Sequence, residues 1–304
     1  MIILCAAMLF TPGCERSVGP RTAFDGEAAL EYVRTQLAFG PRIPGTEGHR
    51  RAGDWIEERM RALADTVIVQ EWTHVTAAGD SLPMRNILAR FRPEADDRIL
   101  YLAHWDTRPV SERAQNRADR DAPVPGANDG ASGVALLIGV ADVLAEQAPE
   151  MGVDLLFVDG EDYGDFGRRE DVLIGASYFA GHLPSLDYRP LFGVLWDMVA
   201  DREIRFYQEG FSVQHAPEVV ARVWRQAEDL GYSEYFVPRV GISITDDHVP
   251  LLQAGLRVID VIDIDDRAIA YEHHHRPTDT LDKISAESLQ IVGDVATALL
   301  LGES

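Results

Sequence analysis

Two adjacent acidic residues, Glu161 and Asp162, come directly after an apolar segment. Residues 155–158 are Leu-Leu-Phe-Val, a composition typical of a strand that is buried on both faces in a parallel sheet. Gly160 then interrupts the strand. Ligands of open α/β sheets bind at the carboxyl ends of the strands. Paired acids at this position therefore indicate a metal ligand beside a general base, with an ordinary capped turn as the alternative.

His104 ends a second apolar segment, residues 98–104, and Asp106 follows two positions later. In an extended chain, residues two apart face the same side. Asp106 could therefore accept the imidazole N–H of His104 and fix its tautomer, as partners of metal-binding histidines do. A buried histidine in a hydrogen-bonded turn is the alternative.

Three further polar segments contain candidate ligands. Asp129 lies in a loop of glycine and alanine, where small residues allow close approach to an ion, although an aspartate before a helix is also a common N-cap. His275 belongs to a histidine-rich internal segment, residues 272–279, which could instead be a surface cluster. Residues 246–248, Asp-Asp-His, fit either a turn or a site.

The cysteines restrict the kind of metal site. Both of them, Cys5 and Cys14, lie within the first 14 residues of the 304-residue chain. Any metal in the body of the chain must therefore be held by His, Asp and Glu. Such ligands, contributed by separate strand ends, are typical of a catalytic zinc site that leaves a position open for water or substrate.

The segments that would position these residues alternate between helix and strand, without repeats or a long linker. This order predicts a single α/β domain over residues 21–304, with a mixed, mostly parallel central sheet and helices on both faces. Parallel strands would bring their polar ends to one edge. The expected strands are 67–75, 84–91, 98–104, 153–158, 191–196, 204–207 and 257–262, and the expected helices are 24–38, 48–64, 134–144, 174–180, 213–230 and 286–301. The four ends expected to meet at that edge carry His104, Glu161, Asp197 and Asp260.

Charge and the N-terminus limit the partners and the location. Fifty acidic against 28 basic residues give a formal charge of −22, which argues against nucleic acid or an anionic membrane as a partner. Residues 1–13 are mostly apolar and uncharged, too short to span a bilayer and similar to an export signal. The ending at residues 11–14 resembles a lipoprotein cleavage box. We expect residues 1–20 to be an export segment and linker, and the protein to be periplasmic or membrane-anchored through a lipid on Cys14.

The complete pattern resembles a known family. His104-x-Asp106, the Asn-Asp-Gly-Ala-Ser-Gly of residues 128–133, Gly160-Glu161-Asp162, Asp197 and His275 are similar in order and spacing to the zinc aminopeptidases of metallopeptidase family 28. The resemblance runs from about residue 24 to residue 301. Residues 104–109, 126–133, 161–164 and 246–248 more closely resemble the glutaminyl cyclases of this family.

The resemblance implies a role for each candidate. Asp129, Asp162 and His275 would bind one zinc ion. Glu161 would be the general acid and base, and Asp197 and Asp246 would form a carboxylate relay. In a one-metal cyclase His104 is a neighbour of the site, whereas in a two-metal aminopeptidase His104 and Asp197 bind a second zinc and Asp129 bridges.

The implied reaction is conversion of N-terminal glutamine to pyroglutamate with release of ammonia, acting on peptide or protein N-termini. The alternatives are hydrolysis of the N-terminal residue by metal-bound water, and a non-catalytic binding protein. The sequence departs from the cyclases at two positions of the substrate pocket, where tryptophans are replaced by Gly167 and His274. Either the pocket is reshaped, or Trp105 or Phe166 substitutes for them.

Overall fold

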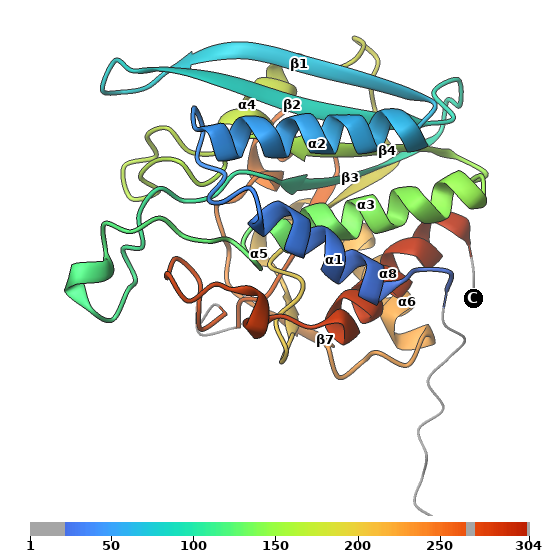
Figure 1. Ribbon diagram of the computed structural model, residues 1–304. Coiled ribbons are helices and arrows are strands. Elements are labelled where there is room, and N and C mark those ends of the chain that lie inside the picture. Colours follow the sequence, from blue (N-terminus) through green and yellow to red (C-terminus); the bar gives the residue numbers. More distant parts are fainter. Residues whose placement is uncertain (1–21, 266–270, 303–304) are drawn as a thin grey trace, which may run out of the picture.

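A computed structural model describes residues 22–265 and 271–302 and contains a six-stranded central sheet. The expected export segment, including Cys14, lies outside the described residues. The strand order is β1-β2-β4-β3-β5-β8, and β6 and β7 form a separate pair (Figure 1). The strands are β1 (Thr66–Val75), β2 (Ser81–Phe91), β3 (Arg98–His104), β4 (Gly152–Val158), β5 (Phe192–Asp197), β6 (Phe206–Gln208), β7 (Phe236–Val240) and β8 (Val258–Ile262).

Helices cover both faces of the sheet, because the buried strands are apolar on both sides. In β3, Ile99 and Tyr101 pack on the face covered by α1, α2, α3, α6 and α8, while Leu100 and Leu102 pack on the face of α4 and α7. The α-helices are α1 (Gly26–Leu37), α2 (Glu47–Leu63), α3 (Ala131–Glu146), α4 (Ile174–Gly181), α5 (Gly210–His215), α6 (Pro217–Asp229), α7 (His248–Gln253) and α8 (Ala286–Leu301). Two short 3₁₀ turns occupy Arg117–Asp119 and Leu281–Lys283.

The predicted fold class is confirmed. Strands β4, β3, β5 and β8 are parallel to one another, and β1 and β2 add an antiparallel edge. Three details differ from the prediction. The helix expected over 213–230 is divided into α5 and α6, since Pro217 cannot continue α5. Strand β7, which contains Pro238, was not predicted. Asp260 lies in the middle of β8 rather than at its end.

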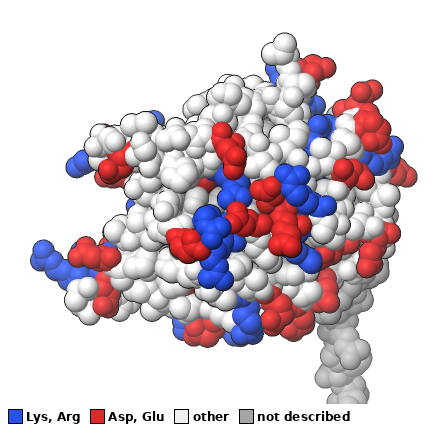
Figure 2. Space-filling model, turned by 45° about the horizontal axis from the view of Figure 1, so that its top comes forward, with Lys and Arg blue, Asp and Glu red and all other residues white. Residues whose placement is uncertain are grey.

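The charged surface is mixed in sign. Figure 2 shows acidic and basic side chains side by side over one face rather than sorted into a single-sign patch. Along α2, Arg50 pairs with Glu47 and Asp54, which also pairs with Arg85. Exposed ion pairs of this kind contribute little stability each. Within the described residues, no helix is both long and apolar enough to span a bilayer.

Candidate metal centre

The ends of three parallel strands form one edge of the sheet, as the sequence predicted. His104 is the last residue of β3, and Asp197 is the last residue of β5. Glu161 and Asp162 follow β4 after a turn at Gly160, whose φ of 67° suits glycine. A Cβ at this position would also collide with Met84. The turn therefore requires glycine to bring both acids to the edge.

Asp129 is brought to the same edge by the small-residue loop before α3. The N-cap of α3 is Gly130, so the N-cap interpretation of Asp129 is wrong. A Cβ at position 130 would lie 2.7 Å from Cε1 of His104, so only glycine allows this approach. The carboxylate of Asp279 accepts the backbone N–H groups of Asn128 (2.9 Å) and Asp129 (3.1 Å), which fixes the loop.

The three residues expected to bind one zinc lie together. Nε2 of His275 is 3.3 Å from Oδ1 of Asp162 and 3.8 Å from Oδ2 of Asp129. Nδ1 of the same imidazole lies 2.6 Å from Oε1 of Glu112. A carboxylate only accepts hydrogen bonds, so Nδ1 carries the proton and directs Nε2 toward the two aspartates.

A second group of donors shares Asp129 with the first. Nε2 of His104 lies 3.2 Å from Oδ1 of Asp129 and 3.3 Å from Oδ1 of Asp197. These are the residues expected at a second metal position. The described residues therefore bring together candidate donors for both the one-metal and the two-metal arrangement.

The donor set fits zinc. Oδ2 of Asp129 and Oδ2 of Asp162 are buried and have no hydrogen-bond partner among the described residues. A buried carboxylate oxygen without a partner is costly unless a cation compensates it. Aspartate oxygens and imidazole nitrogens are ordinary zinc ligands, and a catalytic zinc has three protein ligands and an open position.

Asp106 positions the acid pair rather than acting on His104 alone. Its carboxylate accepts the backbone N–H groups of Glu161 (3.0 Å) and Asp162 (3.2 Å). Oδ1 of Asp106 also lies 3.4 Å from Nδ1 of His104, an ion-pair distance. The predicted hydrogen bond is not formed, because Nδ1 of His104 has no hydrogen-bond partner among the described residues. The two backbone contacts of Asp106 were not predicted.

Glu161 is buried beside the metal ligands but belongs to neither donor group. Burial, followed by the charge of Asp162, raises its pKa well above the usual range. The pKa of Asp246 is raised in the same way by burial and by the charges of Asp197 and Asp247. Carboxyl groups with raised pKa values are better suited to proton transfer than carboxyl groups of ordinary pKa.

His248, in the 246–248 segment, is buried among acidic side chains close to the site. Nε2 of His248 lies 3.3 Å from Oε2 of Glu209, and its Nδ1 lies 3.7 Å from Oδ2 of Asp260. All three side chains are buried. Asp246 lines the pocket described next, so the segment places one acid in the site and anchors it with a buried histidine.

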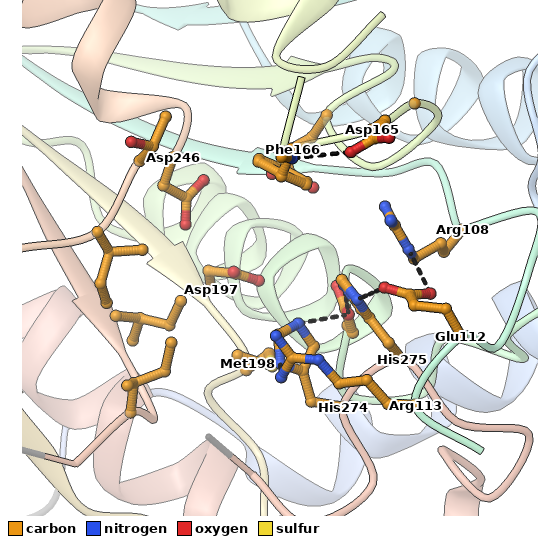
Figure 3. Close-up of a pocket in the computed structure, with 18 of the residues that line it drawn as sticks. Arg108, Glu112, Arg113, Asp165, Phe166, Asp197, Met198, Asp246, His274 and His275 are labelled. Carbon is orange, nitrogen blue, oxygen red and sulfur yellow. Dashed lines mark hydrogen bonds and ion pairs between the residues drawn. The ribbon is translucent and has the colours of Figure 1, made fainter. Parts of the chain in front are cut away.

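A cavity of about 780 Å³ opens onto the candidate ligands Asp129, Asp197 and His275 (Figure 3). Phe166 lines it, as expected, and so do Gly167 and His274. Trp105, the other candidate, does not line the cavity. Its ring is buried, stacks on His49 at 4.3 Å and donates its N–H to the carbonyl of Arg85. The apolar lining comes from Val110, Phe166, Met198, Ile242, Ile244, Ile262 and Ile264.

Sequence reasoning missed the loop that holds the ligands in place. Arg108 donates to Oδ1 of Asp162 (2.7 Å) and to Glu112 (2.8 Å), and Glu112 orients His275. Arg108 directly follows the His104–Asp106 motif, which was a usable signal. No sequence signal marked Glu112, because it lies in a loop without periodicity, 163 residues from His275.

Glu112→Gln is expected to weaken zinc binding about 10- to 100-fold, the usual effect of altering the partner of a metal-binding histidine. Burial opposes ionisation of Glu112, but the hydrogen bond and charge of His275 outweigh it and lower its pKa to about 2. Glutamine removes that charge. Competition against a chelator measures the affinity. Glu272→Gln, at a side chain 75% exposed in the histidine-rich segment, is the matched control. Equal affinity in both variants would show that Glu112 does not support the metal.

The metal-free protein is expected to lose stability as the pH rises from about 5 to about 9. Burial and neighbouring acids raise the pKa values of Glu161 and Asp246, so the folded state retains protons that the unfolded state has released. The pKa of His275 is raised to about 9: burial opposes its charge, but Asp162 and Glu112 outweigh burial. Its contribution is therefore present below about pH 6.5 and is lost toward pH 9.

Zinc removes the cause of this loss, so the stabilisation by zinc is expected to grow over the same pH range. Thermal unfolding of the metal-free and zinc-loaded protein at several pH values measures both trends. The depressed pKa of Glu112 acts in the opposite direction only below about pH 4.5. A metal-free protein that became more stable toward pH 9 would contradict the expectation.

Comparisons with known proteins agree with this geometry. The solved glutaminyl cyclase of Porphyromonas gingivalis is 38% identical, with a TM-score of 0.89 over 92% of this chain and 99% of that one. A zinc-dependent exopeptidase of Parabacteroides distasonis is 32% identical, with a TM-score of 0.89 over 93% of this chain and 100% of that one. A probable zinc metalloprotease of Leptosphaeria maculans is 32% identical over 58% of this chain, which spans only 42% of that protein.

The family model of Peptidase family M28 matches residues 86–300. This range runs from β2 into α8 and includes every residue of both donor groups. The match therefore covers the sheet edge that gathers the ligands as well as the strands behind it. Because the match extends over more than half of the sequence, the chain belongs to Peptidase family M28.

Proposed function

We propose that this chain is a zinc-dependent glutaminyl-peptide cyclotransferase, which converts an N-terminal glutamine of a peptide or protein to pyroglutamate and releases ammonia. The observation that carries the proposal is the group of buried carboxyls, Glu161, Asp197 and Asp246, all lining one pocket and all with raised pKa values. The similarity to a solved bacterial glutaminyl cyclase over nearly the whole chain supports it.

The residues of the chain have separable tasks in this reaction. Asp129, Asp162 and His275 would hold the zinc, which supplies a Lewis acid for the γ-carbonyl of the glutamine side chain. Glu161 takes a proton from the α-amine as that amine attacks the γ-carbon, and passes the proton to the departing ammonia. Asp197 and Asp246 line the same pocket as Glu161 and would form the carboxylate relay, and burial raises the pKa values of both.

No water is consumed, and the nucleophile and electrophile belong to the same residue. The pocket must therefore hold the glutamine so that its α-amine lies next to its own γ-carbonyl. The rate gain then comes mainly from positioning the two reacting groups. The apolar wall of Ile242, Ile244, Ile262 and Ile264 provides a surface for the methylene groups of such a side chain. Burial there also removes competing water from the reacting carbon.

A second candidate function is that of a zinc aminopeptidase. The complete second donor group, His104, Asp129 and Asp197, favours it, because a two-metal site suits hydrolysis. The solved zinc-dependent exopeptidase of similar fold supports it as well. In that reaction a water is the nucleophile, Glu161 takes its proton, and the first peptide bond is cleaved.

A paired assay distinguishes the two functions. The zinc-loaded protein is incubated with a Gln-initiated peptide and, separately, with a Leu-initiated chromogenic amide. The proposal expects ammonia release from the first with its peptide bonds intact, and no cleavage of the second. Free leucine without ammonia release would overturn it in favour of the aminopeptidase. Failure of both reactions would leave a binding protein and overturn the proposed activity.

A further inference from the structure

His274 and His275 are adjacent, line the same pocket and have opposite partners (Figure 3). Nδ1 of His275 lies 2.6 Å from Glu112, which can only accept a hydrogen bond. Nδ1 of His274 lies 2.8 Å from Nη1 of Arg113, which can only donate one. The two imidazoles are therefore held in opposite tautomers.

The consequence for His275 is that Nδ1 carries the proton and Nε2 presents a lone pair to the metal position. The consequence for His274 is the reverse. Its Nδ1 presents the lone pair to Arg113, so the proton of the ring is on Nε2. An imidazole in this state is a hydrogen-bond donor at Nε2 and not a metal ligand, although His274 lies close enough to Asp129 and His275 to complete a metal-binding group.

The Nε2–H of His274 has no acceptor among the described residues. The nearest carboxylate oxygen, Oδ2 of Asp129, is 3.8 Å away, which is beyond a hydrogen bond. The side chain is 14% exposed and lines the cavity together with Glu161 and Asp197. The free N–H is therefore available to a molecule bound in the cavity, next to the metal ligands.

The class of group that it would meet follows from its neighbours. The acids that line the pocket, among them Glu161, Asp197 and Asp246, are suited to an α-amine. Arg108 is engaged by Asp162 and Glu112, and Arg113 directs one of its N–H groups at His274. The neutral Nε2–H of His274 is therefore suited to a hydrogen-bond acceptor. The acceptor that a peptide N-terminus brings to a metal centre is a carbonyl oxygen.

We infer that His274 is a substrate-binding residue that donates its Nε2–H to a carbonyl oxygen of the N-terminal residue of the substrate, and that Arg113 is a positioning residue that fixes its tautomer. The inference rests on the proposed function only in requiring a peptide N-terminus. Cyclisation and hydrolysis both place a carbonyl at the metal centre, so it holds for either reaction.

One short loop determines which ring nitrogen carries the proton in each of the two histidines. Within residues 108–113, Arg108 contacts Asp162, Glu112 contacts His275 and Arg113 contacts His274. The backbone N–H of Arg113 also donates to the carbonyl of His275 (3.3 Å), which keeps the loop against the histidine segment. An acidic partner thus makes a ligand of one histidine, and a basic partner makes a donor of its neighbour.

The tautomer is tested directly by ¹⁵N-histidine NMR of the zinc-loaded protein. The wild type is expected to carry the His274 proton on Nε2, and addition of a Gln-initiated peptide is expected to shift that N–H signal. Arg113→Glu places an acceptor at Nδ1 and is expected to move the proton there, whereas Arg113→Lys retains a donor and the wild-type tautomer. A wild-type proton on Nδ1, or an Nε2–H signal that the peptide leaves unchanged, overturns the inference.

Kinetics and zinc content provide a second test, on whichever substrate of the paired assay is turned over. His274→Leu is expected to lower kcat/KM roughly 100-fold, the usual loss for one donor to a reacting carbonyl. His274→Gln keeps an N–H near the position of Nε2 and is expected to recover much of that loss. Zinc content is expected to be unchanged in both, with His273→Gln as the control for the segment.

Two kinetic outcomes overturn the inference. Loss of zinc from His274→Leu would make His274 a ligand, and an unchanged kcat/KM would leave its N–H without a role. Failure of the proposed function is distinguishable from both. A protein that processes neither substrate still reports the His274 tautomer and its response to peptide by NMR.

Discussion

Glu161→Gln is expected to abolish turnover while zinc stays bound. Glutamine has nearly the shape of glutamate, but it cannot carry the proton between the attacking and leaving groups. The loss of a positioned acid–base group costs about 10²- to 10⁴-fold in rate, and here one group serves both transfers, so the upper part of that range is expected. Measurement of kcat with a Gln-initiated peptide, together with zinc content, checks both parts.

Zinc should remain because Glu161 belongs to neither donor group. Its backbone is held by Asp106, and that contact does not depend on the side chain. Glu170→Gln is the matched control, since Glu170 lies in the same loop with a side chain 50% exposed. If Glu161→Gln kept activity within a few-fold of wild type, another carboxyl would have to carry the proton. Asp246 is the next candidate, because it is buried and its pKa is raised.

The candidate site residues that the sequence indicated, and that the structure brings together, are those marked locally in the sequence. β3, β4 and β5 are continuous apolar segments that end in polar residues, and the parallel sheet then brings those ends together without further information. Asp129 was identifiable because a loop of glycine and alanine precedes an apolar helix. The requirement for Gly130, imposed by the ring of His104, is the physical reason for that composition.

The parts that were missed depend on contacts between distant segments. Glu112 and Arg113 lie in a polar loop without periodicity, and only the folded chain brings them to His275 and His274. The burial of Trp105 could not be foreseen either, because its stacking partner, His49, lies in α2, a distant part of the chain. Sequence therefore predicted the ligands better than the groups that orient them.

Asp129→Ala is expected to weaken zinc binding by more than about 100-fold, since removal of a ligand costs at least as much as removal of its partner. Asp129 is the residue common to both donor groups. Its loss leaves His275 facing Asp162 on one side and His104 facing Asp197 on the other, each with two donors. A catalytic zinc needs three protein ligands, so neither remaining pair is sufficient. Zinc content after dialysis against a weak chelator measures the loss.

The thermal stability of the same variant separates loss of metal from loss of fold. Zinc at about 100 times its dissociation constant stabilises the wild type by about 2.7 kcal/mol, and the variant should lack this gain. The metal-free variant should nevertheless remain folded. Burial raises the pKa values of Asp197 and Asp279, the charge of Asp129 raises them further, and removal of Asp129 relieves that repulsion. Asp165→Ala, which removes an exposed acid from the wall of the same cavity, is the matched control and should retain zinc. Full zinc content in Asp129→Ala would contradict the assignment, and the ion would then have to be held by donors outside the edge formed by β3, β4 and β5.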